Sequence, residues 1–525
     1  MLDCSRNAVM KTEKVKEYIS LVKKLGYNSV MLYLEDTYEV SGQPFFGYMR
    51  GRYTKAELKE IDAYANSLGV ELIPCIQTLA HLNAIFRWGE YAKINDIADV
   101  LLVDDERTYK LIEDMFDTVS ECFTCRTVNV GLDEAHLLGR GKYLDQFGFK
   151  DRFDIFCDHL DKVCKIATDR GFTPVLWSDT FFERSKDNVP YQILNVPEKA
   201  AKRVPKNAQL ICWDYYHTDK DYYDKVLKAH SQFSNRVWYA CSAYASRGFA
   251  PNNAFSISSI KAAMQSCREQ GIKDVVVTMW GGNGAECSLF STLPALFYAA
   301  QAYSGNFDQA DIAQKFKAIT GEDYFAFMAL DLPNDVGVKG QNYGPSKYTL
   351  YNDIFMGVYD CTVKPEYGEI YAEYALKLNE FKLGGKFDYI FDTLSKLCSV
   401  LEIKLGLGYR VRAAYKANDK AALMQTVKDC KEVVLRLESF YTAFKTQWFI
   451  DNKPHGFDVQ DIRLGGLIQR VKSCAQRLTD FIDGKIDKID ELEETLIDIE
   501  SGKEQFEHKI PVINDWKNSA TVNIL

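Results

Sequence analysis

The chain has 525 residues, a length that predicts two or three domains and a sizeable hydrophobic core. Its 64 basic and 73 acidic side chains give a net charge of −9, which argues against nucleic acid or an anionic membrane as the main partner. Hydrophobic residues make up 47% of the chain and charged residues 26%, which is typical of a folded protein rather than a disordered one.

Targeting and cysteine patterns point to an intracellular chain. The sequence has no apolar stretch long enough for a transmembrane helix, and residues 1–13 are too polar and charged for a signal peptide. The 14 cysteines are scattered, as expected of reduced thiols, and the close pair Cys122 and Cys125 lacks the further ligands of a zinc ribbon. We therefore expect a cytoplasmic protein.

Short β-branched or apolar runs alternate with amphipathic segments through the first part of the chain. The runs predicted to be strands are 1–4, 29–34, 70–76, 127–130, 173–177, 209–213, 236–241 and 274–280. Between them, residues 12–25 and 54–68 place apolar side chains at spacings of three and four, as helices do. Several of these helices end at a glycine that leads into the next strand.

This alternation predicts an α/β fold, a (β/α)8 TIM barrel over residues 1–304. An open doubly wound sheet is the alternative, but no G-x-G-x-x-G motif follows an early strand. After Gly305 the strand-like runs fade and helical patterns dominate. We therefore expect an α-helical C-terminal domain over residues 305–525, including an amphipathic helix over 488–500.

Charged and aromatic residues gather where the predicted strands end. They are Asp3, Arg6, Glu35, Asp36, His81, Asp133, Glu134, His136, Trp177, Asp179, Trp213, Asp214, Tyr239, Trp280 and Glu286. In a barrel these ends meet at one mouth. Indole rings stack on the C–H face of a pyranose, while arginine and carboxylates bond its hydroxyls, so the mouth is predicted to bind a sugar.

The segment 130–136, Val-Gly-Leu-Asp-Glu-Ala-His, carries the sharpest signal. Its adjacent carboxylates, Asp133 and Glu134, follow the fourth predicted strand, so one can act as an acid while the other orients a second feature of the substrate. A chance acidic pair in a loop is the competing interpretation. The same letters occur in helicases, but those need a G-x-x-x-x-G-K-[ST] phosphate loop, and the sequence contains no G-K-[ST].

Over residues 1 to about 300, these motifs resemble glycoside hydrolase family 20, the β-N-acetylhexosaminidases, and the tail resembles that of smaller bacterial members. The resemblance implies a retaining mechanism in which the acetamido group of the substrate is the nucleophile. It implies that Glu134 is the general acid and base, that Asp133 holds the acetamido N–H, and that Tyr239 donates to the acetamido carbonyl. Neither a metal nor an organic cofactor is implied.

The resemblance also implies the residues that bind the sugar. Trp177, Trp213 and Trp280 would form the walls of the acetamido pocket and the platform under the ring, with core tryptophans as the competing interpretation. Arg6 would grip the hydroxyls of the non-reducing end and Glu286 would bind O4 and O6. His81 would support the acidic pair.

The sequence departs from the family pattern in three places. Leu132 stands where a second glycine is common, and Cys241 stands where an aspartate often follows the tyrosine. Glu286 lies six residues after Trp280 instead of two. These departures leave the choice between gluco and galacto sugars open.

We therefore expect an exo-acting enzyme that releases terminal β-linked GlcNAc or GalNAc from small oligosaccharides or glycoconjugates. One alternative is a metal-dependent barrel enzyme that uses Glu35, Asp36, Asp133 and Glu134 as ligands. Another is a carbohydrate-binding protein without catalysis. Aromatic residues of the tail could complete the mouth of the site or form the contact of a homodimer, and both readings stay open.

Overall fold

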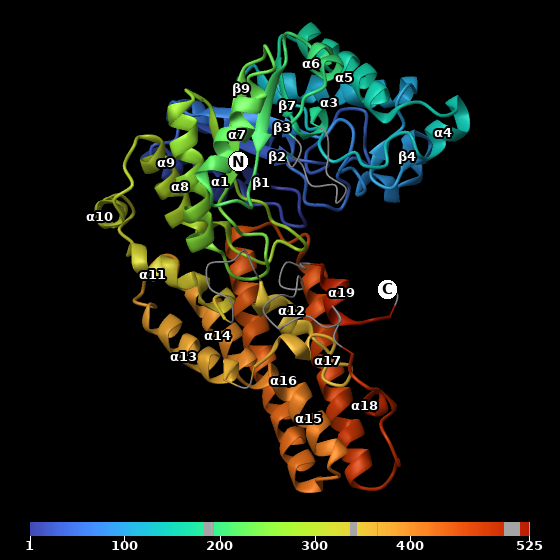
Figure 1. Cartoon of the computed structure of the whole chain (residues 1–525), viewed down its shortest axis with the longest axis vertical. Helices are drawn as coiled ribbons and strands as arrows, with labels where there is room; N and C mark the ends of the chain where they lie inside the picture. The colour runs from blue at the N-terminus through green and yellow to red at the C-terminus, as the bar shows by residue number, and fades with distance from the viewer. Residues whose placement is uncertain (183–190, 192–193, 337–343, 365, 498–514, 524–525) are drawn as a thin grey trace.

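The computed structural model describes residues 1–182, 191, 194–336, 344–364, 366–497 and 515–523. Within this part of the chain, an eight-stranded parallel sheet forms a barrel and a helical region follows it (Figure 1). The predicted barrel with an α-helical C-terminal region is confirmed. The boundary between residues 304 and 305 stays a prediction, and the last helix of the barrel ends at Tyr303.

The barrel strands follow one another in chain order, each within two residues of its predicted limits. They are β1 (Leu2–Asp3), β2 (Ser29–Leu34), β3 (Glu71–Ile76), β6 (Thr127–Asn129), β7 (Thr173–Trp177), β8 (Gln209–Trp213), β9 (Val237–Ser242) and β10 (Val275–Thr278). A small antiparallel hairpin, β4 (Asn95–Ile97) and β5 (Val100–Leu101), is inserted after β3. The barrel closes where Leu2 pairs with Met279 and the Met1 amino group donates to the carbonyl of Val277 at 2.6 Å.

Alternation along the strands decides which residues face the centre of the barrel. Met31, Ile73 and Ile211 belong to a small apolar cluster of their own, separate from the large core between the strands and the helices. Trp177 and Trp213, the last residues of β7 and β8, belong to the same small cluster. This cluster therefore runs up the barrel to the mouth where the strands end.

Helices cover the outside of the barrel (Figure 1). They are α1 (Thr12–Lys24), α2 (Lys55–Ser67), α3 (Glu106–Cys122), α5 (Arg152–Asp169), α6 (Glu198–Arg203), α7 (Lys220–His230), α8 (Asn253–Glu269) and α9 (Leu293–Tyr303). The short helix α4 (Lys142–Phe147) lies in the loop after β6, beside β4 (Figure 1). Short 3₁₀ helices lie at Ile85–Arg87, Gly89–Ile94, Asp179–Phe181 and Leu289–Thr292. Thr54 caps α2 in a reciprocal bond with Glu57.

The C-terminal region consists of helices, with the longest two, α16 and α17, packed side by side (Figure 1). Its helices are α10 (Gln309–Thr320), α11 (Tyr324–Met328), α12 (Pro345–Tyr351), α13 (Tyr367–Glu380), α14 (Asp388–Lys404), α15 (Leu407–Lys416), α16 (Lys420–Asp451), α17 (Phe457–Ile482), α18 (Asp490–Glu493) and α19 (Trp516–Ala520). Two 3₁₀ helices occur at Ala329–Asn334 and Asp360–Thr362.

The amphipathic helix predicted over 488–500 is wrong for its described part, in which only α18 is helical. The buried guanidinium of Arg412 donates to the carbonyls of Glu491, Leu492 and Glu494. Those carbonyls thereby gain a partner outside any helix, and the backbone is extended at Glu494. Residues 498–500 lie outside the described residues.

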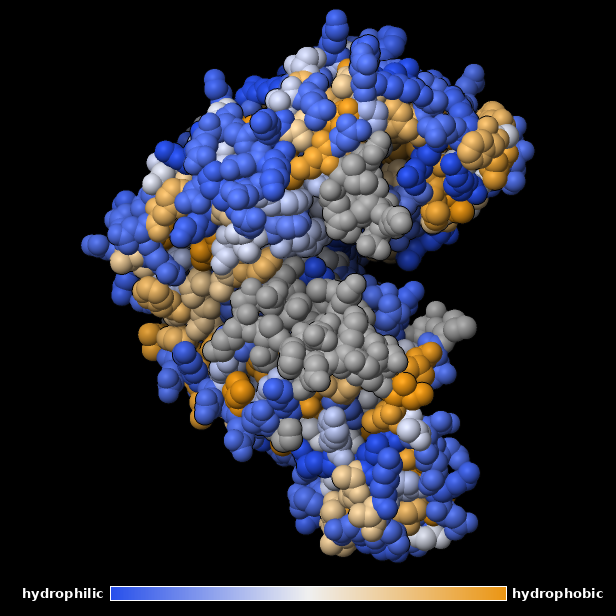
Figure 2. All heavy atoms as spheres, viewed as in Figure 1, coloured by the Kyte–Doolittle hydropathy of each residue, from blue (hydrophilic) through white to orange (hydrophobic). Residues whose placement is uncertain are grey.

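Two further features concern the molecule as a whole. None of the helices in the described ranges is both long and apolar enough to cross a membrane. The surface is deeply indented between the barrel and the helical region (Figure 2). The indentation lies on the side where the loop after β3 and helix α19 face each other (Figure 1).

Candidate active site

The loop after β6 has a backbone shaped around its acidic pair. Gly131, Leu132 and Glu134 all have positive φ angles, of 72°, 72° and 55°. A side chain at Gly131 would displace Gln77, because a Cβ there would lie 2.1 Å from its Oε1. Such strained backbone costs free energy and gathers at functional sites.

Asp133 is held by two side chains that follow the neighbouring strand β3. Gln77 Nε2 donates to its Oδ1 at 2.9 Å, and His81 Nε2 lies 3.2 Å from its Oδ2. Burial by itself would raise the pKa of Asp133, but the charge of His81 and these two bonds lower it. Burial by itself would lower the pKa of His81, but Asp133 raises it to about 9. We therefore expect an imidazolium–carboxylate pair at neutral pH.

Glu134 differs from its neighbour in its surroundings. Its side chain is 45% exposed, and its Oε2 lies 3.5 Å from His81 Nε2. His81 therefore contacts both members of the pair, where the sequence placed it. The structure thus contains two adjacent carboxylates, one fixed and buried and the other free to meet a ligand from solvent.

A chain of polar contacts links Asp133 to Arg6 across the mouth. Gln77 also donates to the Tyr33 hydroxyl at 3.1 Å, and Tyr33 donates to Glu35 at 3.0 Å. Arg6 Nε pairs with Glu35 at 2.8 Å, and its guanidinium lies 5.8 Å from the centre of the Tyr33 ring. Sequence reasoning missed Gln77 and Tyr33. Only their positions in the sequence could have indicated them, since Tyr33 lies near the end of β2 and Gln77 directly follows β3.

Aromatic side chains wall a pocket of about 250 Å³ beside the acidic pair. The residues that line it are Arg6, Asp133, Glu134, Trp177, Trp213, Tyr215, Tyr216, Tyr244, Ser246, Arg247, Trp280 and Gly282. Trp280 stands edge-on to Tyr33 at 4.7 Å between ring centres, and Trp213 lies 5.3 Å from Tyr215. The Trp213 indole N–H donates to Asp179 at 3.2 Å, which fixes this wall. Sequence reasoning missed Tyr215, which follows Trp213 by two residues.

Three predicted site residues are not among those that line this pocket: His81, which contacts the acidic pair, Tyr239 and Glu286. Tyr239 is fully buried, and its hydroxyl donates to the carbonyl of Asp214 at 3.1 Å. The pocket is lined by a different tyrosine, Tyr215. The reason is strand alternation, since Tyr239 belongs to the core outside the barrel sheet. Glu286 is also buried and pairs with Lys347 at 2.8 Å and Arg463 at 3.1 Å, both from the helical region.

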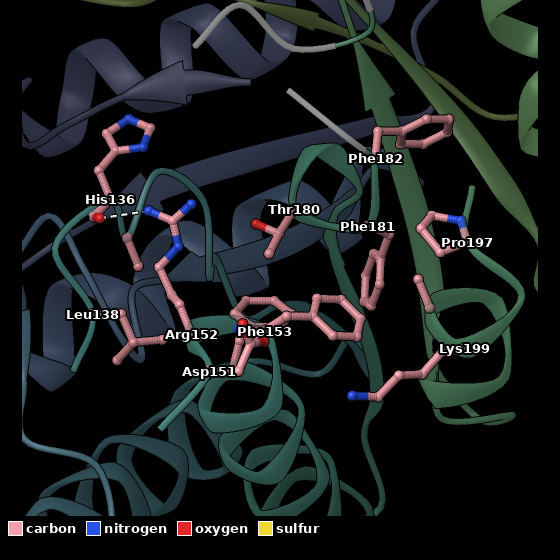
Figure 3. Close-up of a pocket in the computed structure, with 13 residues that line it drawn as sticks. His136, Leu138, Asp151, Arg152, Phe153, Thr180, Phe181, Phe182, Pro197 and Lys199 are labelled. Atoms are coloured by element: carbon pink, nitrogen blue, oxygen red, sulfur yellow. Dashed lines mark hydrogen bonds between the residues drawn. The ribbon is translucent and has the colours of Figure 1, made fainter. Parts of the chain in front are cut away.

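His136 does not join the acidic pair in the pocket. It lines a separate cavity of about 600 Å³, and its carbonyl accepts a bond from Arg152 at 2.6 Å (Figure 3). Phe153 and Phe181 meet edge to face across the same cavity, with ring centres 6.2 Å apart (Figure 3). The cavity therefore lies next to the acidic loop, since Ala135 and His136, which follow Glu134, line it.

The metal-site alternative can be compared with these contacts. Among the described residues, His81, Asp133 and Glu134 bring ligand atoms within 4.8 Å of one another. The other two predicted ligands are engaged elsewhere, Glu35 by Arg6 and Asp36 by Arg50 at 3.2 Å. The four carboxylates of that alternative therefore do not form one ligand set.

Family models match both parts of the chain. The glycosyl hydrolase family 20 catalytic domain matches residues 1–281, more than half of the sequence. The chain belongs to glycosyl hydrolase family 20. The glycoside hydrolase 20C C-terminal domain matches residues 322–510. The family inferred from Asp133, Glu134 and the strand-end tryptophans is confirmed.

Individual relatives are more distant. The chain is 25% identical to hexosaminidase D of Bos taurus over 222 residues, which is 41% of this chain and 61% of the relative. It is 24% identical to hexosaminidase D of Homo sapiens over 231 residues, covering 42% and 45%. The chain thus spans about half the length of these curated relatives.

Solved structures give weaker matches. An N-acetyl-β-hexosaminidase from Streptomyces plicatus has a TM-score of 0.45 at 19% identity, covering 63% of this chain and 68% of that one. An exo-β-N-acetylglucosaminidase from Vibrio harveyi has a TM-score of 0.47 at 15% identity, covering 63% and 57%.

Proposed function

We propose that this family 20 glycoside hydrolase is an exo-acting β-N-acetylhexosaminidase that removes terminal β-linked GlcNAc or GalNAc by substrate-assisted catalysis. The observation that carries the proposal is the unlike pair of neighbouring carboxylates at an aromatic pocket. Asp133 is pinned by Gln77 and His81, while Glu134 is exposed beside it. One carboxylate is thereby suited to orient a group of the substrate, and the other is suited to exchange protons.

Glu134 would act as the general acid and then as the general base. It would protonate the glycosidic oxygen as the bond from C1 to that oxygen breaks, while the acetamido oxygen attacks C1 and forms an oxazolinium ion. Water would then attack C1 and give its proton to Glu134, which restores the acetamido group and the acid. Tethering the nucleophile to the sugar removes the entropy cost of bringing it to the anomeric carbon.

Asp133 would accept the acetamido N–H and stabilise the positive charge that develops on the oxazolinium ion. Its contacts with Gln77 and His81 support this role, because they prevent the carboxylate from turning away. Its low pKa supports it as well, since an ionised group is needed throughout the reaction.

We assign the donor to the acetamido carbonyl to Tyr215 instead of Tyr239. Tyr215 lines the pocket against Trp213, whereas the hydroxyl of Tyr239 is directed at the backbone behind it. Trp177, Trp213 and Trp280 would enclose the acetamido methyl group and the ring face.

Arg6 would bind the hydroxyls of the terminal sugar. Its guanidinium lines the pocket, is oriented by Glu35, and lies against the ring of Trp280 at 5.8 Å. Glu286 is not assigned to O4 and O6, because it lies in the ion pairs with the helical region.

The test compares p-nitrophenyl β-glycosides of GlcNAc and GalNAc with the β-glucoside, which lacks the acetamido group. We expect release of nitrophenol from at least one N-acetyl substrate and from the glucoside at a rate lower by several orders of magnitude. Equal rates on the glucoside would contradict the proposal. Activity abolished by EDTA and restored by a divalent cation would instead support the metal-dependent alternative.

A further inference from the structure

The loop between β10 and α9, residues 280–286, forms part of the pocket wall through Trp280 and Gly282. We call it the β10 loop. On the barrel side it has few anchors, among them a bond from the Gly281 N–H to Asp3 at 2.9 Å and one from Asn7 to the carbonyl of Gly284 at 3.1 Å. Several further polar contacts to the loop come from the C-terminal helices.

Two cations from different helices converge on this loop. Lys347 of α12 donates to the carbonyl of Asn283 at 2.7 Å and pairs with Glu286 at 2.8 Å. Arg463 of α17 donates to the same carbonyl at 3.0 Å, to the Asn283 side chain at 2.8 Å, and to Glu286 at 3.1 Å. One carbonyl and one carboxylate are thus each shared between two cations.

Neutral side chains complete the attachment. Gln460 of α17 donates to the carbonyl of Gly284 at 2.7 Å, and Gln447 of α16 donates to that of Glu286 at 3.2 Å. Consecutive parts of the β10 loop are therefore bound by three helices, and its backbone conformation depends on groups that the barrel does not supply.

The pairing is buried and tightly fitted. The side chains of Lys347 and Glu286 are each 1% exposed, and that of Arg463 is 11% exposed. At Gly284, whose φ is 116°, a Cβ would lie 2.3 Å from a guanidinium nitrogen of Arg463. Buried ion pairs contribute little net stability but hold geometry closely, because separating the charges leaves each without a partner.

The same helices reach two further loops of the pocket. Asn7, next to Arg6, donates to the carbonyl of Gly456 at the start of α17 at 3.0 Å. Gly248, next to Arg247, lies so close to Lys347 that a Cβ would meet that side chain at 2.8 Å. The helical region therefore touches the loops that carry Arg6, Arg247 and Trp280, all of which line the pocket.

We propose that Arg463 and Lys347 are positioning residues for the sugar pocket: they hold the β10 loop so that Trp280 and Gly282 form the wall against which the terminal sugar binds. The inference rests on the proposed function for the identity of the ligand. It assigns the helical region a part in substrate binding in addition to any role in stability.

The experiment uses the full chain with Arg463→Met, Arg463→Lys and the control Arg470→Met. Arg470 lies two turns further along α17 and pairs with the buried Asp353 at 2.6 Å, away from the β10 loop. The first readout is the affinity for N-acetylglucosamine from tryptophan fluorescence. The second is kcat, KM and the pH profile on p-nitrophenyl β-GlcNAc.

We expect Arg463→Met to weaken sugar binding and raise KM by roughly ten- to a hundredfold, which corresponds to the loss of about 1.4 to 2.8 kcal/mol of contact with the pocket wall. Arg463→Lys should recover part of the affinity. The pH profile should stay that of the unmodified protein, because Asp133, Glu134 and His81 lie in the loops after β3 and β6 and not in the β10 loop. Arg470→Met should lower Tm without changing affinity or KM.

Equal affinity and KM in Arg463→Met and Arg470→Met would overturn the inference. If Arg463→Met does not fold, Asn283→Ala, which removes one acceptor of Arg463, replaces it with the same expected direction and the same overturning result. An unmodified protein that binds the sugar but hydrolyses no N-acetylhexosaminide would overturn the proposed function, and the affinities would still decide the role of Arg463.

Discussion

Two loops of the barrel mouth contribute to one pocket and are fixed in different ways. The loop after β6 holds Asp133 through Gln77 and His81, which follow the adjacent strand β3. The β10 loop carries Trp280 and Gly282. It is held by Lys347 and Arg463, which lie 61 and 177 residues beyond Glu286 in the sequence. The Asp133 carboxylate is thus fixed by the barrel, while part of the binding wall is fixed by a region outside it. Chemistry and substrate binding should therefore respond to different sets of mutations.

The largest expected effect comes from Glu134→Gln, which removes the proton donor and leaves the anchors of Asp133 in place. The rate on substrates with poor leaving groups should fall by roughly 10² to 10⁴, and much less on activated aryl glycosides, whose leaving groups need little protonation. A series of aryl β-GlcNAc substrates measures this difference. Equal losses across the series would contradict the acid role and, with it, the division between the two loops.

Asp133→Asn should have the next largest effect and lower kcat by roughly 10² to 10³. The amide keeps the shape of the loop but removes the charge beside His81, so the pKa of His81 should fall from its raised value. NMR titration of the His81 ring checks the second effect independently of turnover. An unchanged His81 titration would show that the pair is not coupled as the contacts indicate.

Tyrosine variants test which side chain serves the acetamido group. Tyr215→Phe should lower kcat/KM by roughly tenfold, the value of one hydrogen bond to the substrate. Tyr239→Phe loses a bond to the carbonyl of Asp214 and one with the Tyr223 side chain, neither of which lines the pocket, so its activity should stay close to that of the unmodified protein. The reverse ranking would restore the assignment of Tyr239 predicted from the sequence.

Glycine variants sharpen the comparison of the two loops. Gly131→Ala would press on Gln77, and Gly284→Ala on Arg463. The positive φ alone should lower the free energy of unfolding of each variant by about 1–2 kcal/mol. The control Gly171→Ala should lose the same amount, because its φ is 77° and a Cβ there meets nothing within 4 Å. Beyond that shared loss, Gly131→Ala should lower kcat and Gly284→Ala should raise KM, which steady-state kinetics and Tm separate. Matching kinetic changes in the two variants would remove the distinction.

A last expected effect falls on stability and not on turnover, namely on the dependence of stability on pH. The pKa of His81 rises on folding from 6.5 to about 9, so its stabilising contribution is complete below pH 6.5 and is lost as the pH rises through 9. Each unit of such a shift corresponds to about 1.4 kcal/mol. Urea unfolding of the unmodified protein and of His81→Gln at pH 6 and pH 10 isolates this contribution. A difference between the two proteins that does not shrink at the higher pH would contradict the pairing with Asp133.

The sequence was sufficient for the features that depend on local pattern. Strand periodicity located the barrel, and the residues after each strand located Asp133, Glu134, Arg6, His81 and the three tryptophans. It failed where the direction of a side chain depends on register, as at Tyr239, which faces away from the barrel centre. It also failed at Glu286, whose partners belong to helices that no sequence spacing connects to it.

The most direct test of substrate-assisted catalysis is inhibition by a thiazoline analogue of the oxazolinium ion. We predict competitive inhibition of p-nitrophenyl β-GlcNAc hydrolysis, with an inhibition constant far below KM, because the analogue resembles the intermediate formed by the acetamido group. Hydrolysis that the thiazoline does not affect would contradict the mechanism assigned to Asp133 and Glu134.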